Sequence, residues 1–323
     1  MSFTTIPKTD LNAYAICFGT SNLGATIDAK TSFAMLDAYA DAGGNMIDTA
    51  IVYSNWIPGT NSTSEKTLGQ WIKARGNRER MIVATKGGHP YLDTMHIPRL
   101  SPQEIVEDLH ASLEHLQTDY IDLYYLHRDD PTRPVQEIVE TLNQQIRTGQ
   151  VRYVACSNWH AERIRAANDY ARAHGLHGFV ANQMLWNLAP VDPGKIADKT
   201  MVSMTDDLYT YHRQTGLAAI PYSSQANGLF QKLAQAGTLD QTRSGAVRMV
   251  DLDETRRRLE RIQHVQSQTA LSITQIVLAY LISQPFPTIP VVGCRTPEQL
   301  ADSLQAADVR LTPAQIAYLE HGH

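Results

Sequence analysis

The sequence has 323 residues, of which 43% are hydrophobic and 19% charged, and this composition is typical of a folded globular protein with a substantial buried core. The formal net charge of −5 and the absence of a basic stripe argue against nucleic acid or an anionic membrane surface as the partner. We therefore expect a small-molecule substrate and neither a nucleic-acid nor a membrane partner.

Strand and helix signals alternate along the chain. Short apolar runs predict eight strands, at residues 15–19, 45–50, 81–86, 121–127, 151–157, 179–184, 216–222 and 288–293. Apolar residues at helical spacing predict helices between them, at residues 28–42, 65–75, 101–116, 134–146, 161–174 and 202–215, two more within 253–283, one from 296 and a short one from 312. Residues 223–252 read as a long polar insertion.

The clearest start signal belongs to the helix that begins at Ser101. A hydroxyl N-cap is followed by Pro102 at the first helical position and by Glu104 three residues after the cap.

The strict alternation, without a linker or a low-complexity break, predicts an α/β fold: a (β/α)8 TIM barrel formed as a single domain over residues 1–323, with long loops after the strands. An open dinucleotide-binding fold is not expected, because no Gly-x-Gly-x-x-Gly turn follows the first strand.

The cysteines and the N-terminus indicate a reducing compartment. Cys17, Cys156 and Cys294 each lie in or beside an apolar run, so we expect buried free thiols. Residues 1–10 contain no apolar signal-peptide core, and no segment approaches the ~20 apolar residues that span a membrane. We expect a cytoplasmic protein; the sequence favours a monomer without fixing the oligomeric state.

Polar residues end three consecutive predicted strands: Asp48 the second, Lys86 the third and His127 the fourth. In a parallel barrel these ends meet at one face, where Tyr53 from the adjoining loop can join them. A phenol has an ordinary pKa near ~10, and a neighbouring ammonium group is expected to lower it. Asp48 would hold Lys86, His127 would donate to a carbonyl oxygen, and Tyr53 would deliver the proton.

Taken singly, each of these residues has an ordinary structural explanation, as a cap, a surface lysine or a buried histidine. Their joint placement on consecutive strand ends favours carbonyl reduction by a hydride cofactor. A metal-dependent barrel enzyme is the weaker alternative, because the twelve histidines form no ligand pair at helical or strand spacing beside a carboxylate. We expect no metal site.

Four motifs resemble the aldo-keto reductase family, over about residues 17–304. These are Asn45-Met46-Ile47-Asp48-Thr49-Ala50 with Tyr53, the Thr85-Lys86 strand end, the Asp119-to-His127 segment and the Gly149-to-Asn158 segment. The resemblance implies an eight-stranded barrel that uses NADPH, less often NADH, and it assigns the catalytic roles to Asp48, Tyr53, Lys86 and His127.

The resemblance also implies cofactor-binding positions. Ser157, Asn158 and Gln183 match the groups that hold the nicotinamide amide, Tyr222 matches the aromatic ring that stacks on the nicotinamide, and Ser223, Gln225 and Leu229 are candidates for the pyrophosphate. Helix capping before Ala161 is the alternative for Ser157 and Asn158. Gly293, Arg295 and Gln299 lie where the adenosine phosphate is expected, and Arg295 favours NADPH, with NADH as the alternative.

Substrate contacts are expected from the long loops, at Trp56, His89, Tyr91, Arg128 and Trp186. Such a mixture of aromatic and polar side chains suits a sugar or another polyhydroxylated carbonyl compound, and the segment from His127 to Pro131 resembles the family's branches with sugar-like substrates. Trp56 could instead anchor its loop, and Arg128 could pair with Asp129 or Asp130 on the surface. Two alternatives to a reductase remain: an NAD(P)-dependent sugar or alcohol dehydrogenase working in the oxidative direction, and a non-catalytic redox-sensing subunit like the potassium-channel β subunits.

Overall fold

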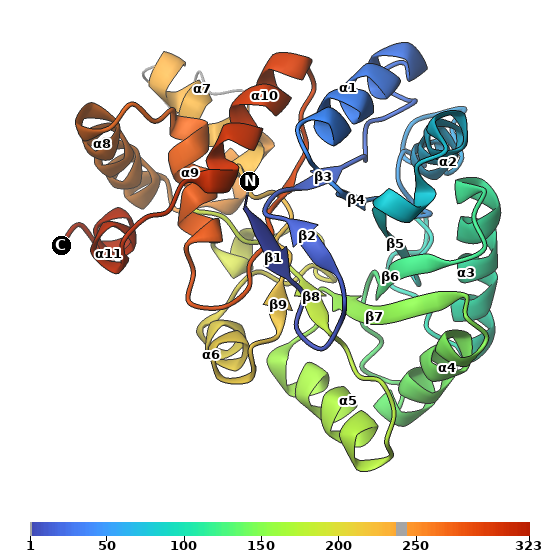
Figure 1. Ribbon diagram of the computed structural model, residues 1–323. Coiled ribbons are helices and arrows are strands. Elements are labelled where there is room, and N and C mark those ends of the chain that lie inside the picture. The colour runs from blue at the N-terminus through green and yellow to red at the C-terminus, as the bar shows by residue number, and fades with distance from the viewer. Residues whose placement is uncertain (1, 237–243) are drawn as a thin grey trace.

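A computed structural model describes residues 2–236 and 244–323 of the chain. Eight parallel strands form one curved sheet in the order β10-β3-β4-β5-β6-β7-β8-β9, with helices around its outside (Figure 1). The strands are β3 (Cys17–Gly19), β4 (Met46–Asp48), β5 (Ile82–Gly87), β6 (Ile121–Leu126), β7 (Val151–Ser157), β8 (Ala181–Gln183), β9 (Ala218–Ala219) and β10 (Val291–Val292).

Hydrogen bonds between the two end strands close the sheet into a barrel. Ala219 at the end of β9 donates to the Pro287 carbonyl and accepts from the Ile289 amide, just before β10. The Val291 amide then donates to the Pro221 carbonyl. The predicted (β/α)8 barrel is confirmed.

The helices alternate with the strands as predicted. Their bounds are α1 (Ala29–Asp41), α2 (Thr63–Arg75), α3 (Pro102–Leu116), α4 (Val135–Arg147), α5 (Ala161–Ala173), α6 (Asp206–Thr215), α7 (Leu229–Ala236), α8 (Leu252–Gln268), α9 (Ile273–Ile282), α10 (Pro297–Gln305) and α11 (Pro313–His321). The start signal at Ser101 is a complete capping box: its side chain accepts from the Glu104 amide, and the Glu104 carboxylate accepts from the Ser101 amide.

An N-terminal hairpin, β1 (Phe3–Thr5) with β2 (Asn12–Tyr14), was not predicted. It lies across the end of the barrel at which the strands begin (Figure 1). Ile6 and Leu11 in its turn pack with the barrel interior, which includes Cys17, Met46 and Leu123. The hairpin therefore plugs this end, and the strands' carboxyl ends are the open face.

Some predicted bounds are wrong. The helix expected from 202 begins only at Asp206, because Val202 and Met204 pair their backbone with Leu185 while Thr205 caps the helix. The strands expected at 179–184, 216–222 and 288–293 are two or three residues long, since only these residues form the regular ladder. The insertion expected at 223–252 contains α7; residues 237–243 of it lie outside the described residues.

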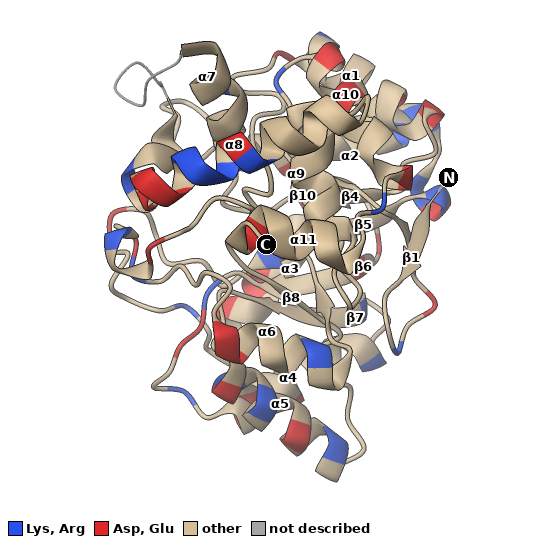
Figure 2. Ribbon diagram, turned by 90° about the vertical axis from the view of Figure 1, so that its left-hand side faces the viewer, with Lys and Arg blue, Asp and Glu red and all other residues tan. Residues whose placement is uncertain are grey.

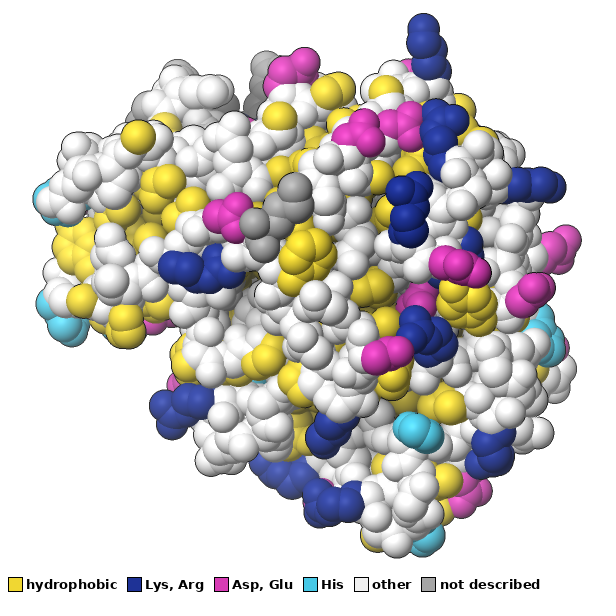
Figure 3. All heavy atoms as spheres, in the orientation of Figure 1, with side chains coloured by type: hydrophobic (Ala, Val, Ile, Leu, Met, Phe, Trp, Pro, Cys, Tyr) yellow, Lys and Arg dark blue, Asp and Glu magenta, His cyan; other side chains and the backbone are white. Residues whose placement is uncertain are grey.

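Charged side chains lie on the outer helices, with Arg and Lys beside Asp and Glu along α8 (Figure 2), and no large field of one charge covers the face in Figure 3. The three cysteines are buried and free, as predicted. Among the described residues no single helix could cross a membrane; the bent pair α8–α9 meets the length and composition only when both helices are taken together.

Candidate active site

The register of the barrel places Asp48 and Lys86 on neighbouring strands. Asp48 on β4 pairs with Ala84 on β5, two residues before Lys86. The Lys86 Nζ atom lies 2.6 Å from Asp48 Oδ1, 2.8 Å from the Thr49 carbonyl oxygen and 2.9 Å from the Tyr53 hydroxyl. These three acceptors match the three hydrogens of an ammonium group. The buried lysine is therefore fully hydrogen-bonded.

The Tyr53 hydroxyl lies between the two charges. It accepts from Lys86 and donates to Asp48 Oδ1 at 3.3 Å. Burial raises the pKa of this phenol well above its ordinary value, and the Asp48 carboxylate raises it further. The lowering of this pKa expected from the sequence is therefore wrong, because burial and the carboxylate outweigh the ammonium. At neutral pH Tyr53 carries its proton and can act as an acid.

His127 follows β6 and is 6% exposed, with its ring edge-on to Tyr53 at a centroid distance of 5.9 Å. Burial lowers its pKa well below the ordinary value, as do Arg128, His89 and Lys86 to a smaller extent, so the imidazole is neutral. Its Nδ1 atom is buried without a partner among the described residues. A buried N–H rarely lacks an acceptor, so the proton belongs on Nε2, which is then a donor for a substrate oxygen.

His89, after β5, lies beside His127 with ring centroids 4.7 Å apart. Its Nδ1 is 2.6 Å from the Pro90 carbonyl oxygen, and a carbonyl can only accept, so Nδ1 carries the proton. Burial, assisted by the Arg128 charge, lowers the pKa of His89 to about 4. Both imidazoles are therefore neutral at physiological pH.

Arg128 is 8% exposed and its guanidinium is held on three sides. Nε donates to Thr200 Oγ1 at 2.7 Å, Nη1 to the His127 carbonyl oxygen at 3.0 Å and Nη2 to Asp198 at 3.2 Å. The alternative of a surface pair with Asp129 or Asp130 is wrong, because Asp129 is paired with Arg163 and Arg128 points to the β8–α6 loop.

The predicted nicotinamide residues form one network. Asn158 has a left-handed backbone with φ of 61°, and its Oδ1 accepts from the Tyr222 hydroxyl at 2.7 Å and the Val202 amide at 3.0 Å. Its Nδ2 donates to the His127 carbonyl and to Ser157 Oγ. The capping alternative is not found, because His160 is the N-cap of α5 and has no side-chain cap bond.

Gln183, at the end of β8, joins this network to the tetrad of Asp48, Tyr53, Lys86 and His127. Its Nε2 donates to Asp48 Oδ2 at 2.8 Å, a link that no sequence signal indicated. Asn158 already uses both of its amide hydrogens and accepts two bonds, whereas Ser157 Oγ accepts one bond and can still donate. The amide and hydroxyl groups gathered here fit the donors and acceptors of a carboxamide, so this set suits a nicotinamide.

The loop after β9 is tied to α10. Gln225 donates to Ser303 Oγ at 2.9 Å, and the Ser223 carbonyl accepts from Asn187. Leu229 is fully buried at the start of α7, and its amide donates to the Ala226 carbonyl. The Leu229 side chain therefore belongs to the hydrophobic core. The polar groups of this loop that face outward come from the residues before Leu229.

Gly293, Arg295 and Gln299 lie at the exposed start of α10. Thr296 caps this helix, and Gln299 Oε1 accepts from the Arg295 amide at 2.9 Å. Within the described residues the Arg295 guanidinium has no hydrogen bond or ion pair. A free cation beside a helix N-terminus fits a phosphate group.

The loops after β4 and β5 carry an apolar rim, formed by Trp56, Tyr91, Leu92 and Ile97 with exposed fractions of 51%, 62%, 43% and 51%. Trp56 contacts the ring of Tyr53 with centroids 6.1 Å apart, and Tyr91 lies on the Arg99 guanidinium. Leu92 and Ile97 were not singled out from the sequence, although large apolar residues recur in this loop, which also contains Tyr91 and Met95.

Trp186 lies in a different environment. It is 7% exposed and packs against Phe286, Tyr280 and Tyr209 in the cluster around α9. It also borders a cavity of about 410 Å³ between the β8–α6 loop, α8 and α11.

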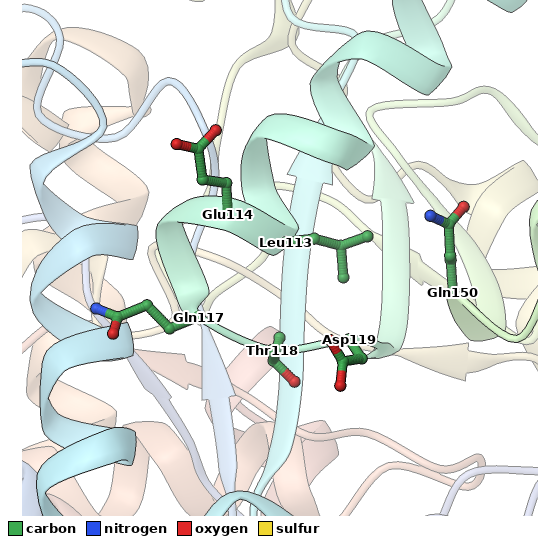
Figure 4. Close-up of a pocket in the computed structure, with 6 residues that line it drawn as sticks. All are labelled: Leu113, Glu114, Gln117, Thr118, Asp119 and Gln150. Atoms are coloured by element: carbon green, nitrogen blue, oxygen red, sulfur yellow. The ribbon is translucent and has the colours of Figure 1, made fainter.

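Another cavity, of about 530 Å³, lies at the end of the barrel where the strands begin (Figure 4). It is formed by the C-terminus of α3, including Glu114 and Gln117, with Asp119 before β6 and Gln150 before β7. Neither cavity is lined by the tetrad. In the part of the chain that the structure describes, no group of three His, Cys, Asp or Glu could hold a metal ion.

Comparison with known proteins agrees with this geometry. A model of the Aldo/keto reductase family matches residues 15–321. An aryl-alcohol dehydrogenase [NADP(+)] of Phanerodontia chrysosporium is 33% identical over 311 residues, covering 91% of this chain and 76% of that protein. The uncharacterized oxidoreductase YrpG of Bacillus subtilis is 31% identical over 322 residues, with 96% and 92% covered. Norsolorinic acid reductase B of Dothistroma septosporum is 28% identical over 330 residues, with 97% and 79% covered.

Proposed function

The chain belongs to the aldo/keto reductase family and is an NAD(P)H-dependent oxidoreductase acting on C=O and CH–OH groups, and we propose that it reduces an aldehyde or ketone with Tyr53 as the proton donor. A nicotinamide cofactor supplies the hydride when bound. Ser157, Gln183 and Tyr222 would hold its nicotinamide. The protein's own contribution is to place a protonated phenol and a neutral imidazole donor at the reacting carbonyl oxygen.

The observation that carries this proposal is the hydrogen-bonding of the phenol. Tyr53 accepts from the Lys86 ammonium at 2.9 Å and donates to Asp48, while the Nε2–H of His127 is left for a substrate oxygen. As negative charge develops on that oxygen, His127 would stabilise it and Tyr53 would transfer its proton. Lys86 would then stabilise the phenolate that remains.

For the cofactor we propose NADPH, because the Arg295 guanidinium beside the start of α10 suits a 2′-phosphate. One of the relatives, the aryl-alcohol dehydrogenase, carries NADP(+) in its name. The test is to measure dissociation constants of NADPH and NADH for the parent and for Arg295→Ala. We expect Arg295→Ala to weaken NADPH about tenfold and to leave NADH unchanged. If the parent bound NADPH and NADH with equal affinity, Arg295 would not bind the 2′-phosphate as proposed.

For the substrate we propose an aromatic aldehyde or ketone rather than a sugar-derived one. Two polar groups that could bind a sugar are already used: the Arg128 guanidinium binds the β8–α6 loop, and His89 Nδ1 donates to the Pro90 carbonyl. What is exposed around the tetrad is instead the apolar rim that includes Trp56 and Tyr91. A planar ring can pack on such side chains, and the aryl-alcohol dehydrogenase relative is consistent with this choice.

The experiment is a turnover assay with NADPH on benzaldehydes, aryl ketones, linear aldehydes and aldoses, run in both directions with the corresponding alcohols. We expect kcat/KM for benzaldehydes to exceed that for aldoses by at least about tenfold. Faster turnover of aldoses than of benzaldehydes would contradict this proposal and support a sugar-derived substrate. Faster alcohol oxidation at neutral pH would favour the dehydrogenase alternative. If no member of the panel turned over, the non-catalytic alternative would stand.

A further inference from the structure

The Arg128 guanidinium is a buried charge with a defined set of partners. It bridges the residue that precedes it, through the His127 carbonyl, to a turn of the β8–α6 loop, through Thr200 Oγ1 and Asp198 Oδ2. Asp198 is itself fixed, because its Oδ1 accepts from the Thr200 amide at 2.9 Å and the Thr200 hydroxyl at 2.6 Å. These three bonds leave from three different nitrogens of the planar guanidinium, an arrangement that the single nitrogen of a lysine cannot reproduce.

The His127 carbonyl oxygen is the meeting point of two elements. It accepts from Arg128 Nη1 at 3.0 Å and from Asn158 Nδ2 at 3.1 Å. Asn158 in turn holds the Tyr222 hydroxyl and the Val202 amide. The backbone of His127 is therefore clamped from the β6 side and from the β7 side, while its side chain has no hydrogen bond at Nδ1 among the described residues. The His127 amide also donates to the Gly87 carbonyl at 2.8 Å, so among the described residues the hydrogen bonds of His127 are all made by its backbone.

We propose that Arg128 is a positioning residue for His127: it clamps the His127 backbone, docks the 198–200 turn beside it, and contacts no substrate. This inference rests on the proposed function of the tetrad and goes beyond it. It replaces the expectation that Arg128 binds substrate, because the guanidinium is turned toward the β8–α6 loop.

The charge of Arg128 has a second effect at the same place. It lowers the pKa values of His127 and His89, in both cases after the larger effect of burial. A buried cation next to a buried imidazole opposes a second positive charge there. The titratable or charged groups around the His127 ring are Lys86, His89, Tyr53 and Arg128. The Arg128 guanidinium is in turn paired with Asp198.

The test compares Arg128→Met, which keeps the length but removes charge and donors, with Arg163→Met as the matched control. Arg163 also binds a loop, through the Asp129 carboxylate and the Asp130 carbonyl, and it has no hydrogen bond to a member of the tetrad. The first readout is the pKa of His127, followed by NMR of isotope-labelled histidine and assigned by the signal lost in His127→Gln. It needs no turnover, so it tests the proposal even if every substrate of the panel fails.

We expect the pKa of His127 to rise by about one unit in Arg128→Met and to stay unchanged in Arg163→Met. With benzaldehyde, kcat should fall about tenfold or more in Arg128→Met while KM changes little, since a displaced donor acts on the transition state. Arg128→Lys should keep the His127 pKa low but leave kcat low, because lysine keeps the charge without the clamp.

Three results would overturn the proposal. One is an unchanged His127 pKa in Arg128→Met. Another is full kcat in Arg128→Lys. The third is a KM for 4-carboxybenzaldehyde that rises about tenfold at constant kcat, which would make Arg128 a substrate contact. Should Arg128→Met not fold, Thr200→Val removes the Nε acceptor together with the hydroxyl bond to Asp198 Oδ1, and so loosens the turn to which Arg128 is bound. A loss of kcat without a change in KM supports the clamp, and no change in kcat contradicts it.

Discussion

In the proposed reaction, Tyr53 and Lys86 divide the work of a general acid between two side chains. The phenol holds the proton because burial and Asp48 raise its pKa, and the ammonium next to it is positioned to stabilise the anion once the proton has left. Burial lowers the pKa of Lys86, and Asp48 opposes that effect. The acid is therefore preformed and needs no conformational change to become protonated.

The directions of these pKa shifts predict the pH dependence of reduction. A group with a raised pKa stays protonated as the pH rises, so Tyr53 keeps its proton; a histidine with a lowered pKa stays neutral as the pH falls, so His127 does not charge. We expect kcat for reduction to be flat between about pH 6 and pH 9. A steady-state profile at saturating cofactor checks this, and a loss of kcat with its midpoint inside that range would contradict it.

The ion pair of Lys86 with Asp48 predicts a stability effect that is not additive. Lys86→Met leaves a carboxylate buried without its cation, which costs about 3 kcal/mol of unfolding free energy. Adding Asp48→Leu to that variant removes the stranded charge and should recover part of this loss. Urea unfolding of the two single variants and the double variant measures the coupling. Additive losses would mean that the two side chains do not interact.

At the scale of the element, helices were easier to predict than strands. The Ser101 box and the Thr296 cap carry their own hydrogen-bond partners within four residues, so their sequences define the starts of α3 and α10. The short strands β8, β9 and β10 depend on partners far away in the chain. An apolar run shows that a segment is buried but does not show where its ladder of hydrogen bonds ends.

Packing between α2 and α3 gives a prediction at this scale. Gly69 faces the end of α3, and a methyl group there would lie 2.4 Å from the His115 carbonyl oxygen and 2.8 Å from Leu116 Cα. Alanine is worth about 1 kcal/mol more than glycine in an exposed helix, but here overpacking against backbone costs about 1–3 kcal/mol. We expect Gly69→Ala to destabilise the protein.

The control is Gln70→Ala on the next, exposed position of the same helix. It should change the unfolding free energy by less than about 0.5 kcal/mol. A Gly69→Ala variant as stable as the parent in thermal or urea unfolding would show that α2 and α3 can separate at little cost.

For the molecule as a whole, the regular alternation of strands and helices was enough to predict the barrel, and the polar residues at the strand ends were enough to predict the face that carries the candidate site. The hydrogen bonds that close the barrel and the hairpin that plugs one end were not predictable in this way. The bonds from Ala219 to Pro287 and Ile289 join segments almost seventy residues apart, and the hairpin around Ile6 has no strong strand pattern of its own. Both depend on tertiary contacts rather than on local sequence.

The part of the candidate site that lies at the strand ends was predictable from the sequence. Asp48, Lys86 and His127 come together because parallel strands finish at one face. The loop residues were less predictable: Arg128 and Trp186 both lie inward, one in a hydrogen-bonded clamp and one in an aromatic cluster. A loop side chain can turn either way without changing the sequence pattern, so its direction is set by partners such as Asp198 and Phe286.

The central claim is that Tyr53 delivers the proton in carbonyl reduction, and one variant tests it most directly. Tyr53→Phe removes a single oxygen from the tetrad and none from the predicted nicotinamide residues. Measured with NADPH and benzaldehyde, its kcat should fall by about 10²–10⁴ while the dissociation constant of NADPH stays within about threefold of the parent. Retention of the full rate would contradict the claim and require a different acid.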